Sequence, residues 1–174
     1  MKAPNNLLET TFENLAIYDP LTMQNDDMTE SPGIYFWFNR HLWKTKKKIK
    51  IEYIGKAVAS GGLKRRIMKE HLRPGFLQPA SKPLSKKEKF QRENPIFDDK
   101  RGDCTDRSSL RRTIGEKEKL KADQTVPFIK KNFLLKVMLL SAAVDSDRNA
   151  MKSKIEKLES DYIRYYNPTY NQKA

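Results

Sequence analysis

Residues 33–38 read GIYFWF and residues 51–55 read IEYIG, and these two stretches decide the fold. Aromatic and β-branched residues dominate both, which is typical of strands, and Pro32 favours an extended entry into the first. The connection between them is short, so the two strands are expected to pair as a hairpin. Residues 40–50 carry six basic side chains and no acidic one, so the tip of this hairpin is a candidate for contact with phosphate.

Hydrophobic periodicity predicts the remaining regular elements. Helices are expected over residues 5–18, 63–72 and 147–166, and a buried strand over residues 133–140. The order strand, strand, helix, insert, strand, helix is that of an α+β protein. We therefore expect a small three-stranded antiparallel sheet that is flanked by helices.

Two regions differ in composition from this framework. Residues 1–30 form an acidic arm that starts with the predicted N-terminal helix. Residues 73–125 form a basic insert with several prolines, in which helical segments are expected at 84–92 and 107–122. A long irregular stretch inside a compact domain is usually functional or disordered, and we assign the insert to partner recognition. Residues 1–174 are expected to form a single domain.

The charge balance indicates a polyanionic partner. The chain has 174 residues, of which 37% are hydrophobic and 33% charged, and its net charge is +13. The acidic arm alone has a net charge of −5, so the rest of the chain carries +18. Clustered lysines and arginines displace counterions from phosphates, so a nucleic acid is the expected partner.

The number of cysteines and the hydropathy of the chain indicate the cellular compartment. Cys104 is the only cysteine in the chain, which excludes an intrachain disulfide and a zinc cluster and suits a reducing cytoplasm. The N-terminus has no basic-then-apolar signal sequence, and no apolar run is long enough to cross a membrane. We expect a cytoplasmic protein, bacterial or encoded by a phage, with no membrane partner.

Several motifs occur in the order found in the GIY-YIG nucleases. GIY occupies residues 33–35 and YIG occupies residues 53–55, each within a predicted strand, and YIG is followed directly by Lys56. The downstream sequence LKRRI is similar to the L-x-x-R-[LI] helix start of that family, with Arg66 in the arginine position. Arg65 is its rival, and only the register of the motif favours Arg66.

The end of the last predicted helix carries a further pattern that resembles the same family. The pattern E-x8-P-x-x-N is formed by Glu159, Pro168 and Asn171, and it is similar to the metal-binding glutamate and the tail of these enzymes. Glu156 and Asp161 are the alternatives for the metal ligand, and the spacing to the proline and the asparagine selects Glu159. Asn171 is expected to have a structural role.

The resemblance implies hydrolysis of a phosphodiester with one divalent metal ion. Glu159 would hold Mg²⁺, for which Mn²⁺ is able to substitute, and Arg66 would hold the scissile phosphate. Tyr35 and Tyr53 are the candidate activators of the attacking water. Because a free tyrosine has a pKa near ~10, such a base needs nearby positive charge, which Lys56, the arginine and the metal would supply. Which tyrosine takes the proton stays open.

Three further positions complete the expected site. Gly33 and Gly55 belong to the two tripeptides and are expected to support the strands. Many members of the family have a histidine four residues after the arginine, whereas His71 follows Arg66 by five. On a regular α-helix such a residue is rotated away, so a distorted helix is needed if His71 is to reach the site. His41, in the basic connection, is assigned to the surface.

A compact nuclease with its own insert, residues 73–125, resembles a GIY-YIG type II restriction endonuclease, and this resemblance implies double-stranded DNA as the substrate. One active site cuts one strand, which suggests a homodimer on a palindromic site, and a restriction enzyme implies a companion DNA methyltransferase. The alternatives are a nicking or homing-type nuclease of relaxed specificity and a non-catalytic DNA-binding module. Candidate DNA contacts are Lys46, Lys47, Lys48, Arg107, Arg111 and Arg112.

Overall fold

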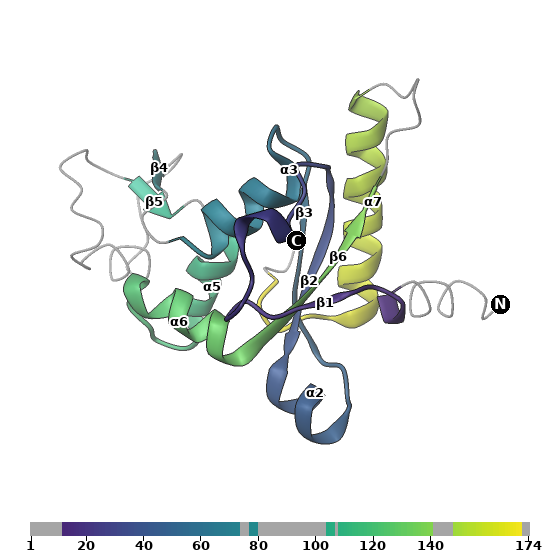
Figure 1. Ribbon diagram of the computed structural model, residues 1–174. Helices are drawn as coiled ribbons and strands as arrows, with labels where there is room; N and C mark the ends of the chain where they lie inside the picture. The colour runs from purple at the N-terminus through teal and green to yellow at the C-terminus, as the bar shows by residue number, and fades with distance from the viewer. Residues whose placement is uncertain (1–11, 74–76, 80–103, 107, 141–147, 172–174) are drawn as a thin grey trace.

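The computed structural model describes residues 12–73, 77–79, 104–106, 108–140 and 148–171. Within these residues the centre of the molecule is a four-stranded antiparallel sheet with the order β1-β6-β2-β3 (Figure 1). Its strands are β1 (Ile17–Tyr18), β2 (Gly33–Asn39), β3 (Ile51–Ala57) and β6 (Phe133–Leu139). The predicted α+β class is confirmed, whereas the predicted number of strands is wrong because the N-terminal arm adds a fourth.

The added strand corrects the prediction of a helix over residues 5–18. Residues 1–11 lie outside the described part of the chain, but Ile17 and Tyr18 pair with Lys136 and Leu135 of β6. A β-branched and an aromatic residue are good strand formers, and β6 offers them unpaired backbone groups on its outer side. Of the described residues of the predicted helix, only residues 12 and 13 are helical, and residues 14–18 are not.

Strands β2 and β3 form the predicted antiparallel hairpin. Gly33 pairs with Ala57 and Trp37 with Tyr53, and a register irregularity follows Trp37. The tip is a helix, α2 (Arg40–Lys46), rather than the expected loop. Asn39 caps this helix, because its side chain accepts a hydrogen bond from the backbone N–H of Leu42 at 2.9 Å.

Helices cover both faces of the sheet. One face, here called the α5 face, packs against α3 (Gly62–Lys64), the π-helix η2 (Arg65–His71), α5 (Ser109–Lys117) and α6 (Ala122–Asn132). The opposite face, here called the α7 face, packs against α7 (Arg148–Tyr166). A short 3₁₀ helix, η1 (Asn25–Asp27), precedes β2. The helices expected over residues 63–72 and 147–166 are confirmed.

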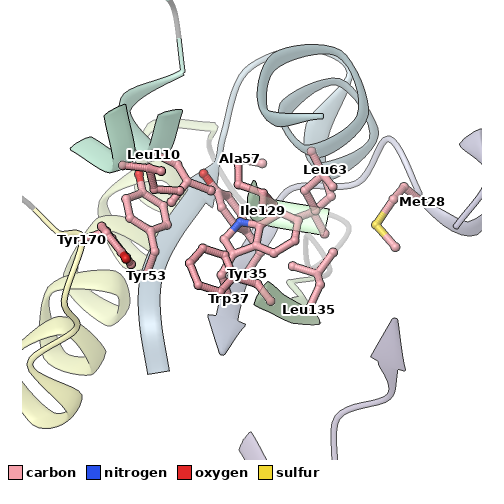
Figure 2. Packing of buried hydrophobic residues seen from close by; sticks show 13 residues of the cluster. Met28, Tyr35, Trp37, Tyr53, Ala57, Leu63, Leu110, Ile129, Leu135 and Tyr170 are labelled. Atoms are coloured by element: carbon pink, nitrogen blue, oxygen red, sulfur yellow. The ribbon is translucent and has the colours of Figure 1, made fainter. Parts of the chain in front are cut away.

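Alternation along β2 divides its side chains between two cores. Tyr35 and Trp37 are buried on the α5 face together with Tyr53, as Figure 2 shows. Ile34 and Phe36 are buried on the α7 face. Both faces of this strand are covered, which explains why GIYFWF is apolar throughout instead of alternating with polar residues.

The basic insert is only partly described. Strand β4 (Leu77–Pro79) pairs with β5 (Cys104–Asp106) in a separate two-stranded sheet. The helix expected over 107–122 is the shorter α5, and the one expected over 84–92 lies outside the described residues. Sequence analysis missed α6 because Pro127 interrupts its pattern.

The chain returns along the open edge of β3 after α7. The backbone N–H of Tyr170 donates to the carbonyl of Glu52 at 2.7 Å. The side chain of Asn171 then accepts from the N–H of Ile54 at 2.8 Å and donates to its carbonyl at 2.7 Å. An asparagine amide thus pairs with the edge strand as another strand would. Within the described part of the chain, no helix has the length and apolar composition that a membrane span requires.

Candidate active site

Tyr35 stands at the centre of a hydrogen-bonded cluster on the α5 face. Its hydroxyl lies 2.7 Å from Nε2 of His71 and accepts a hydrogen bond from Nε of Arg66 at 3.2 Å. Tyr35 and His71 are fully buried, whereas the Arg66 side chain is 27% exposed. Of the two neighbouring arginines in η2, it is Arg66 and not Arg65 that bonds to the tyrosine. The structure therefore brings three predicted site residues together.

His71 reaches Tyr35 because η2 is a π-helix. Its backbone hydrogen bonds join residues five apart, as from the N–H of Leu72 to the carbonyl of Ile67 at 2.9 Å. The wider turn places side chains that are five positions apart on the same side of the helix. The spacing between Arg66 and His71, which an α-helix would not accommodate, is thus compatible with a shared site.

Tyr53 joins the cluster through a residue that sequence analysis missed. Its hydroxyl lies 2.7 Å from Oγ of Ser109, the first residue of α5, and Nη2 of Arg66 donates to the same oxygen at 3.5 Å. The rings of Tyr35 and Tyr53 have centroids 6.2 Å apart. Ser109 therefore links the second tyrosine to the arginine.

Two more residues of the cluster were not predicted. Oγ of Ser108 lies 2.7 Å from Nδ1 of His71, and the carboxylate of Glu70 binds Nη1 of Arg66 and lies 3.5 Å from Nε of Arg65. Both had a signal in the sequence. Paired serines before an apolar run are typical of a helix start, and a glutamate four residues after an arginine has the spacing of an ion pair.

The electrostatics of the cluster keep its two central groups neutral near pH 7. Burial raises the pKa of Tyr35 well above its usual range, and Tyr53 adds to the rise while Arg66 opposes it. Burial, followed by nearby positive charge, holds the pKa of His71 well below its usual range. A neutral imidazole beside a neutral phenol is able to accept the phenolic proton.

A second cluster lies between β3 and the middle of α7. Nζ of Lys56 donates to Oε2 of Glu159 at 2.8 Å and lies 3.5 Å from Oε1 of Glu156. Burial alone would lower the pKa of Lys56, but the two glutamates raise it. The alternative metal ligand Asp161 instead faces Arg164 at 3.4 Å. The structure thus places Glu159 and Glu156, but not Asp161, around one cation.

The second cluster is within electrostatic reach of the first, because the charge of Glu159 contributes to raising the pKa of Tyr35. Glu159 and Glu156 already converge on an ammonium group, and the Glu159 side chain is 16% exposed. No group of three or more His, Cys, Asp or Glu residues lies together in the described part of the chain. One or two carboxylates fit Mg²⁺, which keeps most of its ligands as water and substrate oxygens.

The lysines predicted to contact DNA lie away from these clusters. Lys46, Lys47 and Lys48 are exposed at the hairpin tip. Figure 1 shows that this tip, formed by α2, and helix α3 lie at opposite ends of strands β2 and β3. A DNA duplex would have to extend along the sheet to touch both places.

The arginines assigned to base reading need a correction. Arg107 lies outside the described residues. Arg111 is fully buried, and its Nη1 donates to the backbone carbonyl of Arg73 at 2.7 Å. Arg111 lies on the inner side of α5, so its guanidinium does not face the surface and is not placed to contact the edge of a DNA base. Arg112, the next residue, is half-buried.

Two of the predicted supporting residues have clear packing reasons. A Cβ at Gly33 would overlap the backbone carbonyl of Met138 in β6 and would lie 2.9 Å from Cδ1 of Leu63. Asn171 holds the C-terminal segment against β3, as described above. Gly55 lies opposite Tyr35 in the hairpin.

Comparison of the chain with protein-family models, with curated proteins and with solved structures gives no match. The functional assignment therefore rests on the residues and their geometry.

Proposed function

We propose that the protein is a metal-dependent DNA endonuclease of the GIY-YIG type, and more specifically a type II restriction enzyme. One observation carries this proposal: Arg66, Tyr35 and His71 form a continuous hydrogen-bonded chain, and the charge of Glu159, which is ion-paired with Lys56, acts on Tyr35. A phosphate ligand, a hydroxyl with a proton acceptor and a carboxylate for a metal are the groups that phosphodiester hydrolysis needs. The basic charge of the chain supports DNA as the substrate.

Arg66 is suited to hold the scissile phosphate. Its guanidinium is oriented by Tyr35, Ser109 and Glu70, while part of the side chain reaches the surface. A guanidinium that is held on several sides loses little freedom when a phosphate binds. Charge-assisted hydrogen bonds to the phosphoryl oxygens would then stabilise the negative charge of the transition state.

Tyr35 is suited to take a proton from the attacking water as its own phenolic proton moves to Nε2 of His71. Both groups are neutral in the resting site, so the transfer is uphill there and belongs to the transition state. Tyr53 bonds to Ser109, which is not a base. Tyr35 has His71 as a proton acceptor and is therefore the better candidate of the two tyrosines. Because Tyr35 is fully buried, substrate binding has to open access for the water.

Glu159 would hold the Mg²⁺ ion, and Lys56 would move from the carboxylate toward a phosphate or water oxygen. A divalent ion held by this carboxylate would polarise phosphate and water oxygens and would offset the unfavourable effect of the carboxylate on a Tyr35 phenolate. The partly exposed Glu156, at the longer distance from Lys56, is the less suitable ligand.

The test is cleavage of a sequenced plasmid with Mg²⁺ or with EDTA, followed by mapping of the ends. We expect Mg²⁺-dependent double-strand cuts at one short motif, and we expect Glu159→Gln to abolish them while DNA binding in a gel-shift assay persists. Glu156→Gln is the matched control and should retain most of the activity. Binding without cleavage by the unmodified protein would contradict the proposal and indicate a DNA-binding module.

Nicks or cuts without a motif would indicate the nuclease of relaxed specificity. The proposed homodimer follows from one active site per chain and a duplex substrate with two strands. Light scattering of the protein–DNA complex measures it, and a complex with a single protein chain would reject it.

A further inference from the structure

Glu70 lies between the two arginines of η2. Its carboxylate binds Nη1 of Arg66 and lies 3.5 Å from Nε of Arg65. The Glu70 side chain is only 8% exposed, whereas the side chains of the two arginines are 27% and 33% exposed. One buried carboxylate thus interacts with two cations that are partly open to solvent.

The π-helix explains why a carboxylate and an imidazole both belong to this cluster. In an α-helix, a residue four positions after Arg66 would lie beside it, and a residue five positions after it would be rotated away. The wider turn of η2 places both positions next to Arg66. Glu70 therefore contacts the guanidinium directly, while His71 is linked to it through Tyr35.

The guanidinium of Arg66 keeps enough donors for a phosphate while Glu70 stays bound. Among the described residues, Nε donates to Tyr35, Nη1 to Glu70 and Nη2 to Ser109. A guanidinium has five N–H groups, so these three bonds leave two, which is the number that a bidentate phosphate contact uses. A phosphate is thus able to bind Arg66 without displacing the carboxylate.

The two anions would then share one guanidinium. Glu70 and a bound phosphate both carry negative charge, and they would repel each other at short range where most water is excluded. The hydrogen bond from Nη1 to Glu70 favours a fixed orientation of Arg66, whereas the charge of Glu70 opposes the binding of phosphate. The same carboxylate thus has two separable effects on one arginine.

We propose that Glu70 limits the affinity of Arg66 for phosphate, while its hydrogen bond keeps the guanidinium oriented. The inference rests on the proposed function for its consequence on DNA. A duplex of unrelated sequence is bound through its phosphates, so an acidic side chain beside the phosphate ligand lowers the affinity for every duplex. Stable binding then depends on contacts with the bases.

The first measurement titrates the metal-free protein with inorganic phosphate. The ¹⁵N–¹H signal of the Arg66 side chain, assigned by comparison with Arg66→Lys, reports binding. We expect Glu70→Gln to bind phosphate roughly tenfold more tightly than the unmodified protein, because the amide still accepts from Nη1 but carries no charge. Glu70→Asp keeps the charge and should gain no affinity.

Three results of this titration would overturn the proposal. They are an unchanged affinity in Glu70→Gln, an equal gain in Glu70→Asp, and an Arg66 signal that phosphate does not move in any variant. Asp161→Asn controls for net charge, because Asp161 faces Arg164 on α7 at 3.4 Å and its loss changes the charge of the protein by the same amount. A gain in Asp161→Asn equal to that in Glu70→Gln would also contradict the role.

Binding to DNA tests whether the effect passes through Arg66. The probe is a duplex of mixed sequence in EDTA, followed by fluorescence anisotropy. Glu70→Gln should lower the Kd by roughly tenfold, and this gain should vanish in an Arg66→Ala background. A gain that persists in the absence of Arg66 would show that Glu70 acts on another group, which would contradict the proposal.

Cleavage kinetics separate this role from a merely structural one. Glu70→Gln should lower KM and keep kcat within a few-fold, whereas Glu70→Ala, which also removes the hydrogen bond, should lower kcat. A disrupted site would lose affinity instead of gaining it. A protein that does not cut DNA but whose Arg66 binds phosphate more tightly in Glu70→Gln would refute the proposed function and leave the role of Glu70 intact. An active nuclease with no gain of affinity in Glu70→Gln would refute the role alone.

Discussion

Tyr35 and Gly55 face each other across the β2–β3 hairpin, and the tyrosine side chain occupies the space that a side chain at position 55 would need. A Cβ built on Gly55 would overlap the phenol ring and its hydroxyl. The last residues of the two tripeptides thus form one packing unit, because the glycine of the second makes room for the tyrosine of the first. The orientation of the Tyr35 hydroxyl toward His71 depends on it.

Gly55→Ala is expected to destabilise the fold by about 1–3 kcal/mol, the usual cost of overpacking a core, and to displace Tyr35. The measurement is urea denaturation, combined in a double-mutant cycle with Tyr35→Leu, which removes the phenol. In the Tyr35→Leu background the penalty should largely vanish, because the overlap is with the ring. An equal penalty in both backgrounds would show that the clash is with other groups.

Arg66→Ala is expected to lower the cleavage rate by roughly 10²–10³-fold, as the loss of a donor to a transition-state charge does. Arg66→Lys should recover little, because one ammonium cannot replace a guanidinium held by Tyr35 and Glu70. Arg65→Ala is the matched control and should keep the rate within a few-fold. If Arg65→Ala lowered the cleavage rate more than Arg66→Ala, the assignment of the phosphate ligand to Arg66 would be wrong.

Asn171→Ala is expected to lower the free energy of unfolding by about 1–3 kcal/mol, because it removes two hydrogen bonds and leaves the edge groups of Ile54 without this partner. Asn171→Asp should be at least as harmful, because a carboxylate oxygen would then face the Ile54 carbonyl. Urea denaturation measures both variants. Unchanged stability in both would mean that water replaces the amide at no cost.

The ion pair between Asp19 and Arg40 should make stability depend on pH in acid. The bond from Arg40 lowers the pKa of Asp19 below its usual value of 3.8, so this carboxylate stabilises the fold above that value and the contribution is lost as the pH falls through the lower, folded value. Arg40 is buried and also donates to the carbonyls of Lys130 and Phe133, so Asp19→Asn leaves its charge poorly compensated.

We therefore expect Asp19→Asn to be less stable than the unmodified protein at pH 7, and its urea midpoint to vary less between about pH 2 and pH 5. Asp26→Asn is the matched control. Asp26 pairs with Lys64 on the surface, its side chain is 97% exposed, and exposed pairs contribute little. A parallel loss of stability in both variants would argue against a special role for the buried arginine.

Replacing Lys46, Lys47 and Lys48 by glutamine tests whether the hairpin tip touches DNA. Each phosphate contact that is lost should reduce the slope of log affinity against log salt by about 0.9. A control variant replaces three exposed lysines on other elements, Lys131, Lys154 and Lys157. If both variants change the slope equally, the tip contributes only through net charge.

Much of the framework was predictable from local patterns. The strands around GIYFWF, IEYIG and FLLKVML, and the helix that ends before Pro168, follow from β-propensity and helical periodicity. The arginine and glutamate were also selected by spacing, and the structure places each beside the groups that the proposed chemistry needs. These features depend on residues close together in the chain, which is why they were visible in it.

The errors have a common physical cause. Ile17 and Tyr18 became a strand only because β6 had an open edge, and α6 tolerates Pro127 because its packing outweighs one lost hydrogen bond. Arg111 carries a charge that suggested a DNA contact, yet the helix turns it inward. Each outcome was decided by a partner element distant in sequence.

By itself the sequence determined the strands of the hairpin, the strand that starts at Phe133 and the last helix, and it identified which tyrosines, arginine and glutamate are candidates for a site. The tertiary structure alone decided how they meet: the π-turn of η2 places His71 against Tyr35, and the start of α5 brings Ser108 and Ser109 to the same cluster. Strand and helix propensities are local properties of the chain. The direction of a buried hydrogen bond depends on donors and acceptors that only folding brings together.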